Sequence, residues 1–444
     1  MPTRSSRYDV AVLGAGAAGC VLAARLSEDP DRRVCLVEAG PDYGPYAEGR
    51  WPEDIRDARS LALESHTWET ALDDRSQLRA RIVGGCSAHN ACAVLRGAPA
   101  DYDEWGPGWT SADLEPYLER GERALRTRTV GEDELSPWHC AWMEAGGEDA
   151  IAYPINAVGV VRWNAAFAYL DPARDRPNLT IRADTLVDRI DPETGSVTTD
   201  HGELSADLIV LAAGSYGSPA ILLRSGIGPG LAHDLPVGEG LADHVGVGFG
   251  WEPNAVLHRE TDEFAKRAPV FMGQMTVRGR SENCPDGISD LFFFPAIDPG
   301  WEISGAVFMM KPSSRGRVSL LSSDPAAPLS IEHGFLSDER DAIALTEGAE
   351  RLRELAASEP VRRYAAREIR PGAQVDAATH VREGARGFFH PTGTCALGRV
   401  VDREARLLGA PSVVVADASI MPTIPSVTVH LSTIAIAEKV AELL

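Results

Sequence analysis

Short apolar runs that end at a glycine or an acid recur along the chain. They comprise residues 8–13 (YDVAVL), 34–38 (VCLVE), 208–214 (LIVLAAG) and 412–417 (SVVVAD). Continuous apolar runs of this length are typical of strands buried on both faces of a parallel sheet. Between the first two runs, a glycine turn is followed by helical spacing through about Ser27. We therefore expect a βαβ start and one sheet assembled from distant segments.

A different pattern fills the interval from 249 to 372. It contains three consecutive aromatic residues at 292–294, a polar and apolar alternation at 318–320, and helical spacing from 341 to 355. These features predict a second domain, a sheet with helices, inserted into the first; a final helix is expected from about 433 to 444. The predicted boundaries assign 1–125, 178–248 and 373–444 to the first domain, and 126–177 and 249–372 to the second.

Charge and composition point to a small-molecule partner. The chain has 444 residues, 65 acidic against 43 basic, and a net charge of −22. Nucleic acid and anionic membranes require a basic face, so neither is expected as a partner. No apolar window reaches the roughly 18 residues of a membrane span, and the N-terminus lacks a signal-peptide pattern, so a cytoplasmic location is expected. The seven scattered cysteines and the histidines show no disulfide or metal-ligand spacing.

A glycine motif follows the first apolar run. Gly14, Gly16 and Gly19, with Ala17 and Ala18 between them, form G-x-G-x-x-G, and Glu38 closes the next strand. Such glycines let backbone N–H groups approach a pyrophosphate, and the acid can accept hydrogen bonds from a ribose. The alternative is a packing turn followed by a surface acid. The context favours a dinucleotide without separating FAD from NAD.

More specific blocks are RIVGGCS at 81–87, GSYGSPAILLRSGIG at 214–228 and FHPTGTC at 389–395. With these blocks in family order, the chain resembles the glucose-methanol-choline (GMC) oxidoreductases, closest to the choline oxidase and choline dehydrogenase subgroup. The resemblance implies an α/β fold: a Rossmann-like FAD-binding domain with an inserted α+β substrate domain built on an antiparallel sheet. It also implies FAD-dependent oxidation of an alcohol to an aldehyde or ketone, by hydride transfer to flavin N5, with oxygen or another electron acceptor.

The resemblance assigns cofactor contacts along the chain. It places the glycine motif at the FAD pyrophosphate, Glu38 with Ala39 at the adenosine ribose, and Val187 at the adenine. Asp417 and Ala418 would lie near the ribityl chain. The loop along the isoalloxazine would comprise Gly84, Gly85, Ser87, His89, Asn90 and Ala91. In the choline oxidase subgroup the corresponding histidine is bonded to the flavin, so His89 is either a covalent anchor or a non-covalent neighbour of the ring.

The resemblance also assigns the catalytic groups. His390 would face flavin N5 as the base, a role that suits imidazole because its intrinsic pKa lies near neutrality; a histidine merely hydrogen-bonded in a loop is the alternative. A second polar partner is expected near the C-terminus. Counting backward from the last helix selects Thr428, whereas residue type selects His430, which as the first residue of a helix could also serve packing alone. His244 lies in a family motif that we interpret as structural.

The chain is shorter than most of the family, and the segment from 126 to 167, which carries Trp138, Trp142 and Trp163, is especially short. A reduced cap would suit a bulky or carrier-borne alcohol, or a site completed by a second subunit in a homodimer. Two alternative functions follow from family variety. One is a dehydrogenase that reoxidises a carrier-type redox cofactor, of the mycofactocin-associated type; the other is a flavin-containing hydroxynitrile lyase.

Overall fold

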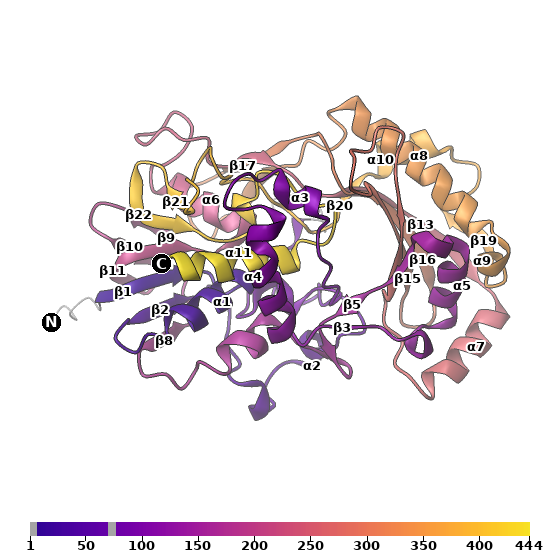
Figure 1. Cartoon of the computed structure of the whole chain (residues 1–444), viewed down its shortest axis with the longest axis horizontal. Helices are drawn as coiled ribbons and strands as arrows, with labels where there is room; N and C mark the ends of the chain where they lie inside the picture. Colours follow the sequence, from indigo (N-terminus) through magenta and orange to yellow (C-terminus); the bar gives the residue numbers. More distant parts are fainter. Residues whose placement is uncertain (1–6, 70–76) are drawn as a thin grey trace.

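The computed structural model describes residues 7–69 and 77–444. The distant apolar runs form one eight-stranded sheet, in the order β21-β22-β11-β1-β2-β8, with β10 attached to β11 and β9 to β10 (Figure 1). The neighbours β22, β11, β1, β2 and β8 pair in parallel. The prediction of one sheet built from separate segments is therefore confirmed. The strands are β1 (Arg7–Leu13), β2 (Val34–Val37), β8 (Leu179–Arg182), β9 (Val187–Asp191), β10 (Ser196–Thr199), β11 (Gly202–Leu211), β21 (Arg406–Leu407) and β22 (Ala410–Val415).

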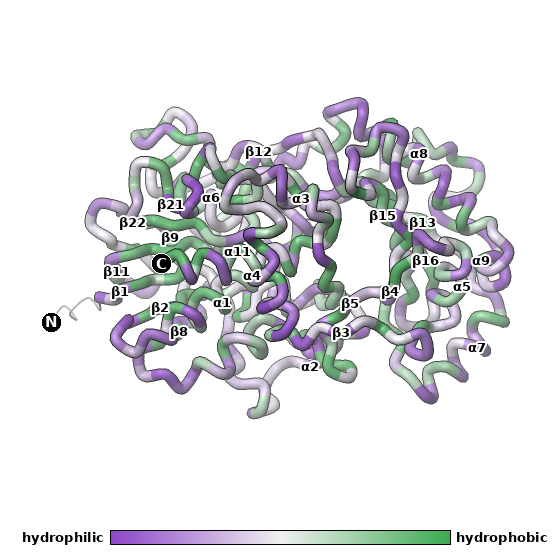
Figure 2. The backbone as a smooth tube through the Cα atoms, viewed as in Figure 1, coloured by the Kyte–Doolittle hydropathy of each residue, from purple (hydrophilic) through white to green (hydrophobic). Residues whose placement is uncertain are grey.

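Helices and short turns enclose this sheet. The apolar strands β1, β11 and β22 lie together at its centre (Figure 2), and their side chains share one core with those of α1 and α11. The last helix starts at His430, three residues before the predicted start. The elements are α1 (Ala17–Leu26), α2 (Glu53–Arg56), α3 (Pro99–Asp103), α4 (Ser111–Ala124), α6 (Gly214–Arg224), α11 (His430–Leu443), η1 (Tyr46–Glu48), η3 (Gly85–Ala88), η6 (Ala166–Leu170) and η7 (Ala418–Ile420).

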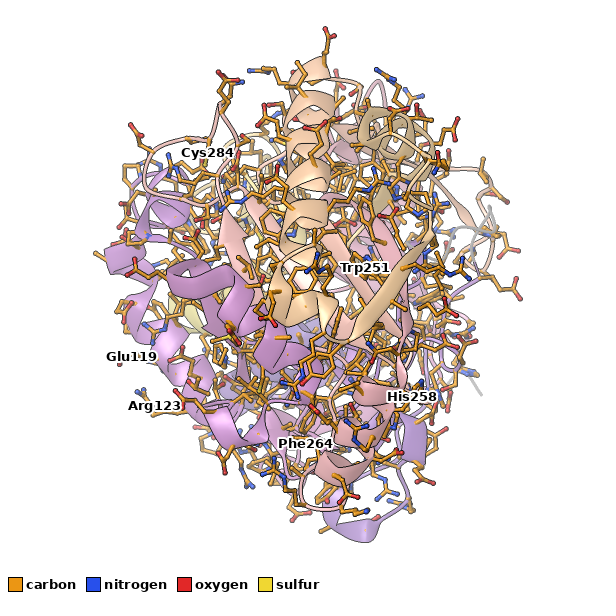
Figure 3. All side chains as sticks on the ribbon, turned by 90° about the vertical axis from the view of Figure 1, so that its right-hand side faces the viewer. Glu119, Arg123, Trp251, His258, Phe264 and Cys284 are labelled. Atoms are coloured by element: carbon orange, nitrogen blue, oxygen red, sulfur yellow. The ribbon has the colours of Figure 1, made fainter. Side chains whose placement is uncertain are left out.

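A second, antiparallel sheet carries its own core. Its order is β19-β13-β16-β15-β14-β4, with β20 attached to β13. The helix α8 crosses its outer face above Trp251 (Figure 3), and Trp138 and Trp142 of α5 pack in the same core. The elements are β4 (Ala150–Ala152), β13 (Val245–Pro253), β14 (Met275–Gly279), β15 (Leu291–Ile297), β16 (Ile303–Met309), β19 (Ala365–Arg370), β20 (Arg386–Gly387), α5 (Pro137–Gly146), α7 (Ala255–Ala265), α8 (Glu339–Ala356), α9 (Glu359–Arg362) and α10 (Ala377–Gly384).

Smaller elements join the two sheets. Trp163, which the sequence places with the substrate region, packs in the first core instead. Separate cores are consistent with two domains, but the exact domain boundaries stay a prediction. The remaining elements are β3 (Arg128–Thr129), β5 (Pro154–Ile155), β6 (Ala157–Val158), β7 (Val161–Arg162), β12 (Glu239–Leu241), β17 (Gly316–Leu320), β18 (Leu329–Glu332), η4 (Glu132–Glu134) and η5 (Gly147–Asp149).

Candidate active site

The glycine motif forms the turn between β1 and α1. Gly14 has a φ of 102°, and a Cβ at Gly19 would lie 1.8 Å from the Gly14 carbonyl oxygen, so both glycines serve the turn itself. Gly16 differs, because a Cβ there would meet no atom closer than 4.0 Å. Ala17 and Ala18 follow as the first residues of α1. The missing side chain thus leaves open space over the N-terminus of a helix, which is where a pyrophosphate binds.

Glu38 is buried beside this turn. Its carboxylate accepts hydrogen bonds from the backbone N–H groups of Ala15 (2.8 Å) and Gly40 (2.9 Å), and burial raises its pKa to about 7. The carbonyl of the following Ala39 accepts from Arg81. The backbone N–H of Thr185 donates to the Glu38 carbonyl (2.8 Å), which brings the start of β9 at Val187 close to the acid.

The Gly84–Asn90 loop packs directly against the glycine turn. The Gly84 N–H donates to the Ala15 carbonyl (2.7 Å), and a Cβ at Gly85 would lie 2.5 Å from the Gly16 Cα. Ser87 closes the loop by donating from its hydroxyl to the Gly84 carbonyl (2.6 Å). The Gly84–Asn90 loop and the glycine turn therefore form one continuous surface, called the cradle below. A dinucleotide with a ring at one end would need such a surface.

His89, the last residue but one of this loop, is a buried, neutral imidazole. The residue is only 3% exposed, and its Nε2 has no hydrogen-bond partner among the described residues. Burial, aided by the nearby charge of Arg162, lowers the pKa of His89 to about 4. Arg162 is itself fully buried and donates to the backbone carbonyls of Ile55 and Ser60. His89 is thus uncharged at neutral pH.

Asp417 connects the ends of two central strands. Its carboxylate accepts hydrogen bonds from the Gly214 N–H (2.9 Å), the Ser218 hydroxyl (2.6 Å) and the Ser419 N–H (2.8 Å). Ala418 follows at the start of η7. These hydrogen bonds satisfy the Asp417 carboxylate. A cofactor that contacts this segment would therefore meet its main chain.

His390 lies where the chain passes from β20 of the second sheet back to the first. Phe389 before it has a φ of 63°, a conformation that is strained for a non-glycine residue. The His390 backbone N–H donates to Asp243 (2.9 Å), and its ring Nδ1 lies 2.9 Å from Nδ1 of His244. Burial, followed by the electrostatic effects of the nearby His244, Arg79 and His430, lowers the pKa of His390 well below the ordinary value.

His430 lies near His390 and contacts Asn90. The Asn90 carbonyl oxygen accepts from the Cys92 N–H (3.0 Å), so its amide nitrogen faces His430 Nδ1 at 3.4 Å. Burial lowers the pKa of His430 to about 4, and its Nε2 has no partner among the described residues. Thr428 instead donates to the Ala93 carbonyl (3.4 Å). These contacts favour His430 over Thr428 as the second polar partner. Ala91 lies between Asn90 and Ala93, the two residues that make the contacts.

An aromatic face adjoins His390. The ring of Phe388 lies 4.6 Å from that of His390 and stacks on Phe308 at 3.7 Å. Phe294 meets Phe388 edge-on, and Tyr153 stacks on Phe294. Phe294, Phe308 and Phe388 are only partly buried. The site therefore joins two imidazoles to an apolar surface supplied by the second sheet.

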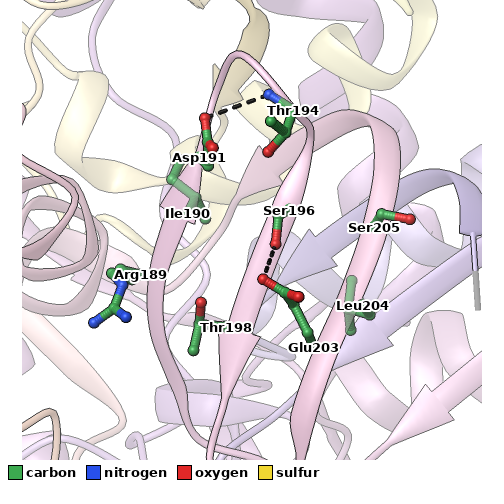
Figure 4. A pocket seen from close by; sticks show the side chains of 9 residues that line it. All are labelled: Arg189, Ile190, Asp191, Thr194, Ser196, Thr198, Glu203, Leu204 and Ser205. Atoms are coloured by element: carbon green, nitrogen blue, oxygen red, sulfur yellow. Dashed lines mark hydrogen bonds between the residues drawn. The ribbon is translucent and has the colours of Figure 1, made fainter. Parts of the chain in front are cut away.

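Other features of the described residues do not suggest a rival centre. No group of three His, Cys, Asp or Glu side chains there is arranged to hold a metal ion. A hollow lies over β9, β10 and β11, where Thr194 N–H donates to Asp191 and Ser196 donates to Glu203 (Figure 4). Its lining includes none of the residues around His390. Among the helices of the described chain, none is long and apolar enough to cross a membrane.

Comparison with known proteins identifies the family. Two family models described as GMC oxidoreductase match residues 155–246 and 312–437, and a lycopene cyclase model matches residues 9–77, the segment with the nucleotide turn. The 5-(hydroxymethyl)furfural oxidase of Methylovorus sp. is 31% identical over 98% of both chains. The chain belongs to the GMC oxidoreductase family. Within it, the human mitochondrial choline dehydrogenase is 29% identical, over 98% of this chain and 89% of the relative.

Solved GMC structures share the fold. Pyridoxine 4-oxidase from Mesorbium loti superposes with a TM-score of 0.85 at 26% identity, over 98% of both chains. A fungal aryl-alcohol oxidase superposes with a TM-score of 0.78 at 20% identity, over 99% of both. The alignment to the human relative spans 536 positions, whereas this chain has 444 residues, so that relative carries segments without a counterpart here.

The residues fit FAD, the cofactor that the family and its FAD-dependent neighbours support. The open space at Gly16 and the buried carboxylate of Glu38 suit the nucleotide half, and the unpartnered ring nitrogen of His89 suits a polar ring at the other end of the cradle. The sequence missed one contact of this site. His244, interpreted as structural, touches His390, and the only signal was its position in an Asp-His pair just before a strand.

Proposed function

We propose that this protein oxidises an alcohol to an aldehyde or ketone with His390 as the base. The observation that carries the proposal is that two neutral imidazoles lie between the cradle and the aromatic face. His390 adjoins Phe388 of that face, and His430, which contacts Asn90 of the cradle loop, is near enough to lower the pKa of His390. FAD supplies the hydride acceptor when bound. Oxygen or another electron acceptor then takes the electrons from the reduced FAD. The homodimer expected from the sequence stays a prediction.

His430 binds the substrate oxygen. Because Asn90 donates to its Nδ1, the single ring proton of the neutral imidazole lies on Nε2. That N–H can donate to the hydroxyl oxygen of an alcohol, while His390 accepts the hydroxyl proton. His430 thereby holds the substrate oxygen while His390 removes its proton.

The aromatic face orients the rest of the substrate. Phe294, Phe308 and Phe388 present partly exposed apolar surface beside His390, which suits a substrate with an apolar or ring-shaped group next to its carbinol carbon. Packing against that face excludes water from the reacting atoms.

We further propose that His89 forms a covalent bond to FAD. Support comes from its neutral ring, its unpartnered Nε2 and its place at the end of the cradle. A neutral imidazole nitrogen has a lone pair that would form an N–C bond to the 8α-methyl group of FAD. That methyl group would lose a C–H proton, and the flavin ring would take up the two electrons and pass them to oxygen or another acceptor.

Anaerobic mixing with an alcohol panel tests the oxidation. The panel holds choline, 5-(hydroxymethyl)furfural and pyridoxine, which the names of relatives indicate, together with benzyl alcohol. We expect at least one to bleach the flavin absorption, and His390→Ala to slow bleaching by roughly 100-fold to 10,000-fold with FAD content retained. Absence of bleaching by any alcohol would contradict oxidation and favour a lyase, which needs no hydride transfer. Unchanged bleaching by His390→Ala would exclude His390 as the base.

A further inference from the structure

We propose that His244 is a positioning residue that holds the His390 ring in one tautomer, with its proton on Nδ1 and its lone pair on Nε2. The inference rests on the proposed role of His390 as the base. It assigns to His244 a part in the reaction that its position in the sequence motif does not indicate.

The backbone fixes the proton of His244. Its Nε2 lies 2.9 Å from the carbonyl oxygen of Pro425, and a carbonyl oxygen can only accept a hydrogen bond. His244 Nε2 must therefore be the donor. The ring is 0% exposed, and burial lowers its pKa to about 3, so it carries a single proton at neutral pH. Nδ1 of His244 is consequently an acceptor.

The acceptor on His244 in turn fixes His390. The two Nδ1 atoms are 2.9 Å apart, and two lone pairs at this distance would repel, so His390 Nδ1 is the donor. Because the His390 ring is also held neutral, its Nε2 carries the lone pair. The opposite tautomer would place a proton on Nε2 and leave no base for the substrate.

Main-chain pairing aligns the two rings. The N–H of Phe388 donates to the His244 carbonyl (3.0 Å), and Ala242 and Thr392 exchange backbone hydrogen bonds of 2.8 and 3.1 Å. The two rings lie nearly perpendicular, at 86°, with centroids 5.1 Å apart. Their contact therefore depends on the pairing of two chain segments that lie 146 residues apart in sequence.

The same contact serves the protonated state. When the hydroxyl O–H bond breaks and an N–H bond forms at His390 Nε2, the ring becomes an imidazolium that still donates from Nδ1 to the neutral His244. A hydrogen bond from a charged donor is stronger than one from a neutral donor. The proton is thus stabilised on His390 while the hydride leaves the carbinol carbon.

Two substitutions separate positioning from packing. His244→Phe keeps a ring of similar size but removes the acceptor, whereas His244→Asn retains an acceptor oxygen near the place of Nδ1. With the fastest alcohol of the panel, we expect His244→Phe to slow anaerobic flavin reduction by roughly 100-fold or more, as wrong-tautomer variants do, and His244→Asn to stay within about tenfold. The matched control is His139→Phe, the same change at a buried histidine of α5, which should leave the rate unchanged.

A readout without substrate judges the tautomer alone. Long-range ¹H–¹⁵N spectra of the ¹⁵N-histidine-labelled holoenzyme, assigned with His390→Asn and His244→Asn, report which ring nitrogen carries the proton. We expect a proton on His390 Nδ1 in the wild type, and on Nε2 or on both in His244→Phe. A proton on His390 Nε2 in the wild type, or a His244→Phe variant that reduces flavin at the wild-type rate, would overturn the inference. Failure of His390→Ala to slow bleaching would instead overturn the proposed function and leave the spectrum valid.

Discussion

The imidazoles of the site differ in the contacts of their ring nitrogens. His430 meets the amide of Asn90, His244 meets the Pro425 carbonyl, and Nε2 of His89 meets no partner in the described chain. A neutral imidazole has one donor and one acceptor, so the contact at one nitrogen determines the role of the other. His89 and His430 both keep a buried Nε2 without a hydrogen-bond partner among the described residues.

At the residue scale, the free Nε2 of His89 predicts the fate of the flavin colour on denaturation. In the wild type we expect acid-denatured polypeptide to stay yellow and to carry the mass of FAD. His89→Ala should release all colour, because no nitrogen remains to hold the cofactor, while His139→Phe should behave as the wild type. Colourless wild-type polypeptide with FAD free in solution would mean that the loop contacts the ring without a bond.

Residue type and motif selected His390 and His430, since their chemistry is evident from sequence. They could not select His244, because the proposal for it rests on contacts with the Pro425 carbonyl and the His390 ring, which only the fold brings together. The choice between Thr428 and His430 was open for the same reason, because it depends on contacts with Asn90 and Ala93 that only the fold supplies. His430 as the second group stays a proposal.

At the scale of elements, the glycine turn and the Gly84–Asn90 loop act as one unit. Gly19 and Gly85 are required by the protein itself, because a Cβ at either would lie 1.8 and 2.5 Å from neighbouring backbone. Gly16 meets no such obstacle. Packing within the chain therefore explains two of the glycines, and a bound diphosphate would explain the third.

Gly16→Ala should therefore separate cofactor binding from folding. We expect FAD affinity to fall at least about tenfold, because the added methyl group would occupy the space over the helix N-terminus. The change in the free energy of unfolding of the FAD-free protein should stay below about 1 kcal/mol. FAD content and urea unfolding measure the two effects. Gly248→Ala, where a Cβ also meets no neighbour, is the control, and equal FAD content in both variants would argue against the assignment.

Four strands of the first sheet, β1, β2, β11 and β22, were predictable because their apolar runs are continuous. The exact ends of elements, and the core that each side chain joins, were not predictable. The start of α11 at His430 precedes the apolar stretch that marks the helix in sequence. Trp163 joins the first core although its neighbours in sequence lead toward the second sheet. Both outcomes depend on tertiary packing, which a local pattern does not contain.

At the scale of the whole molecule, buried titratable groups make stability depend on pH. His89, His139 and His244 are at most 3% exposed, and burial lowers their pKa values to about 4, 4 and 3. Below the ordinary histidine pKa of about 6.5, the unfolded chain takes up protons that the folded chain refuses. Glu38 and Asp243 oppose this, because burial raises their pKa to about 7, so the folded chain binds their protons first.

His390 and His430 add to this effect, because their pKa values are lowered as well. Five histidines therefore outweigh two carboxyls, and we expect the free energy of unfolding to fall between about pH 6.5 and 4.5, by about 1.4 kcal/mol per pH unit for each unbalanced group. Below about pH 4.5 the folded histidines begin to bind protons too, so their contribution to the decline lessens. Urea unfolding of the holoenzyme across this range measures the slope. His139→Phe should flatten it, and a protein that becomes more stable from pH 6.5 to 4.5 would contradict this account.

The segments that carry His244 and His390 run side by side as the chain crosses between the two sheets. Ala242 pairs with Thr392, and Val245, where β13 begins, pairs with Gly387. These pairings hold the backbone around both imidazoles independently of the outer strands of the second sheet. New substrate-facing strands grafted beyond these pairings should change which alcohol enters while inheriting an intact base.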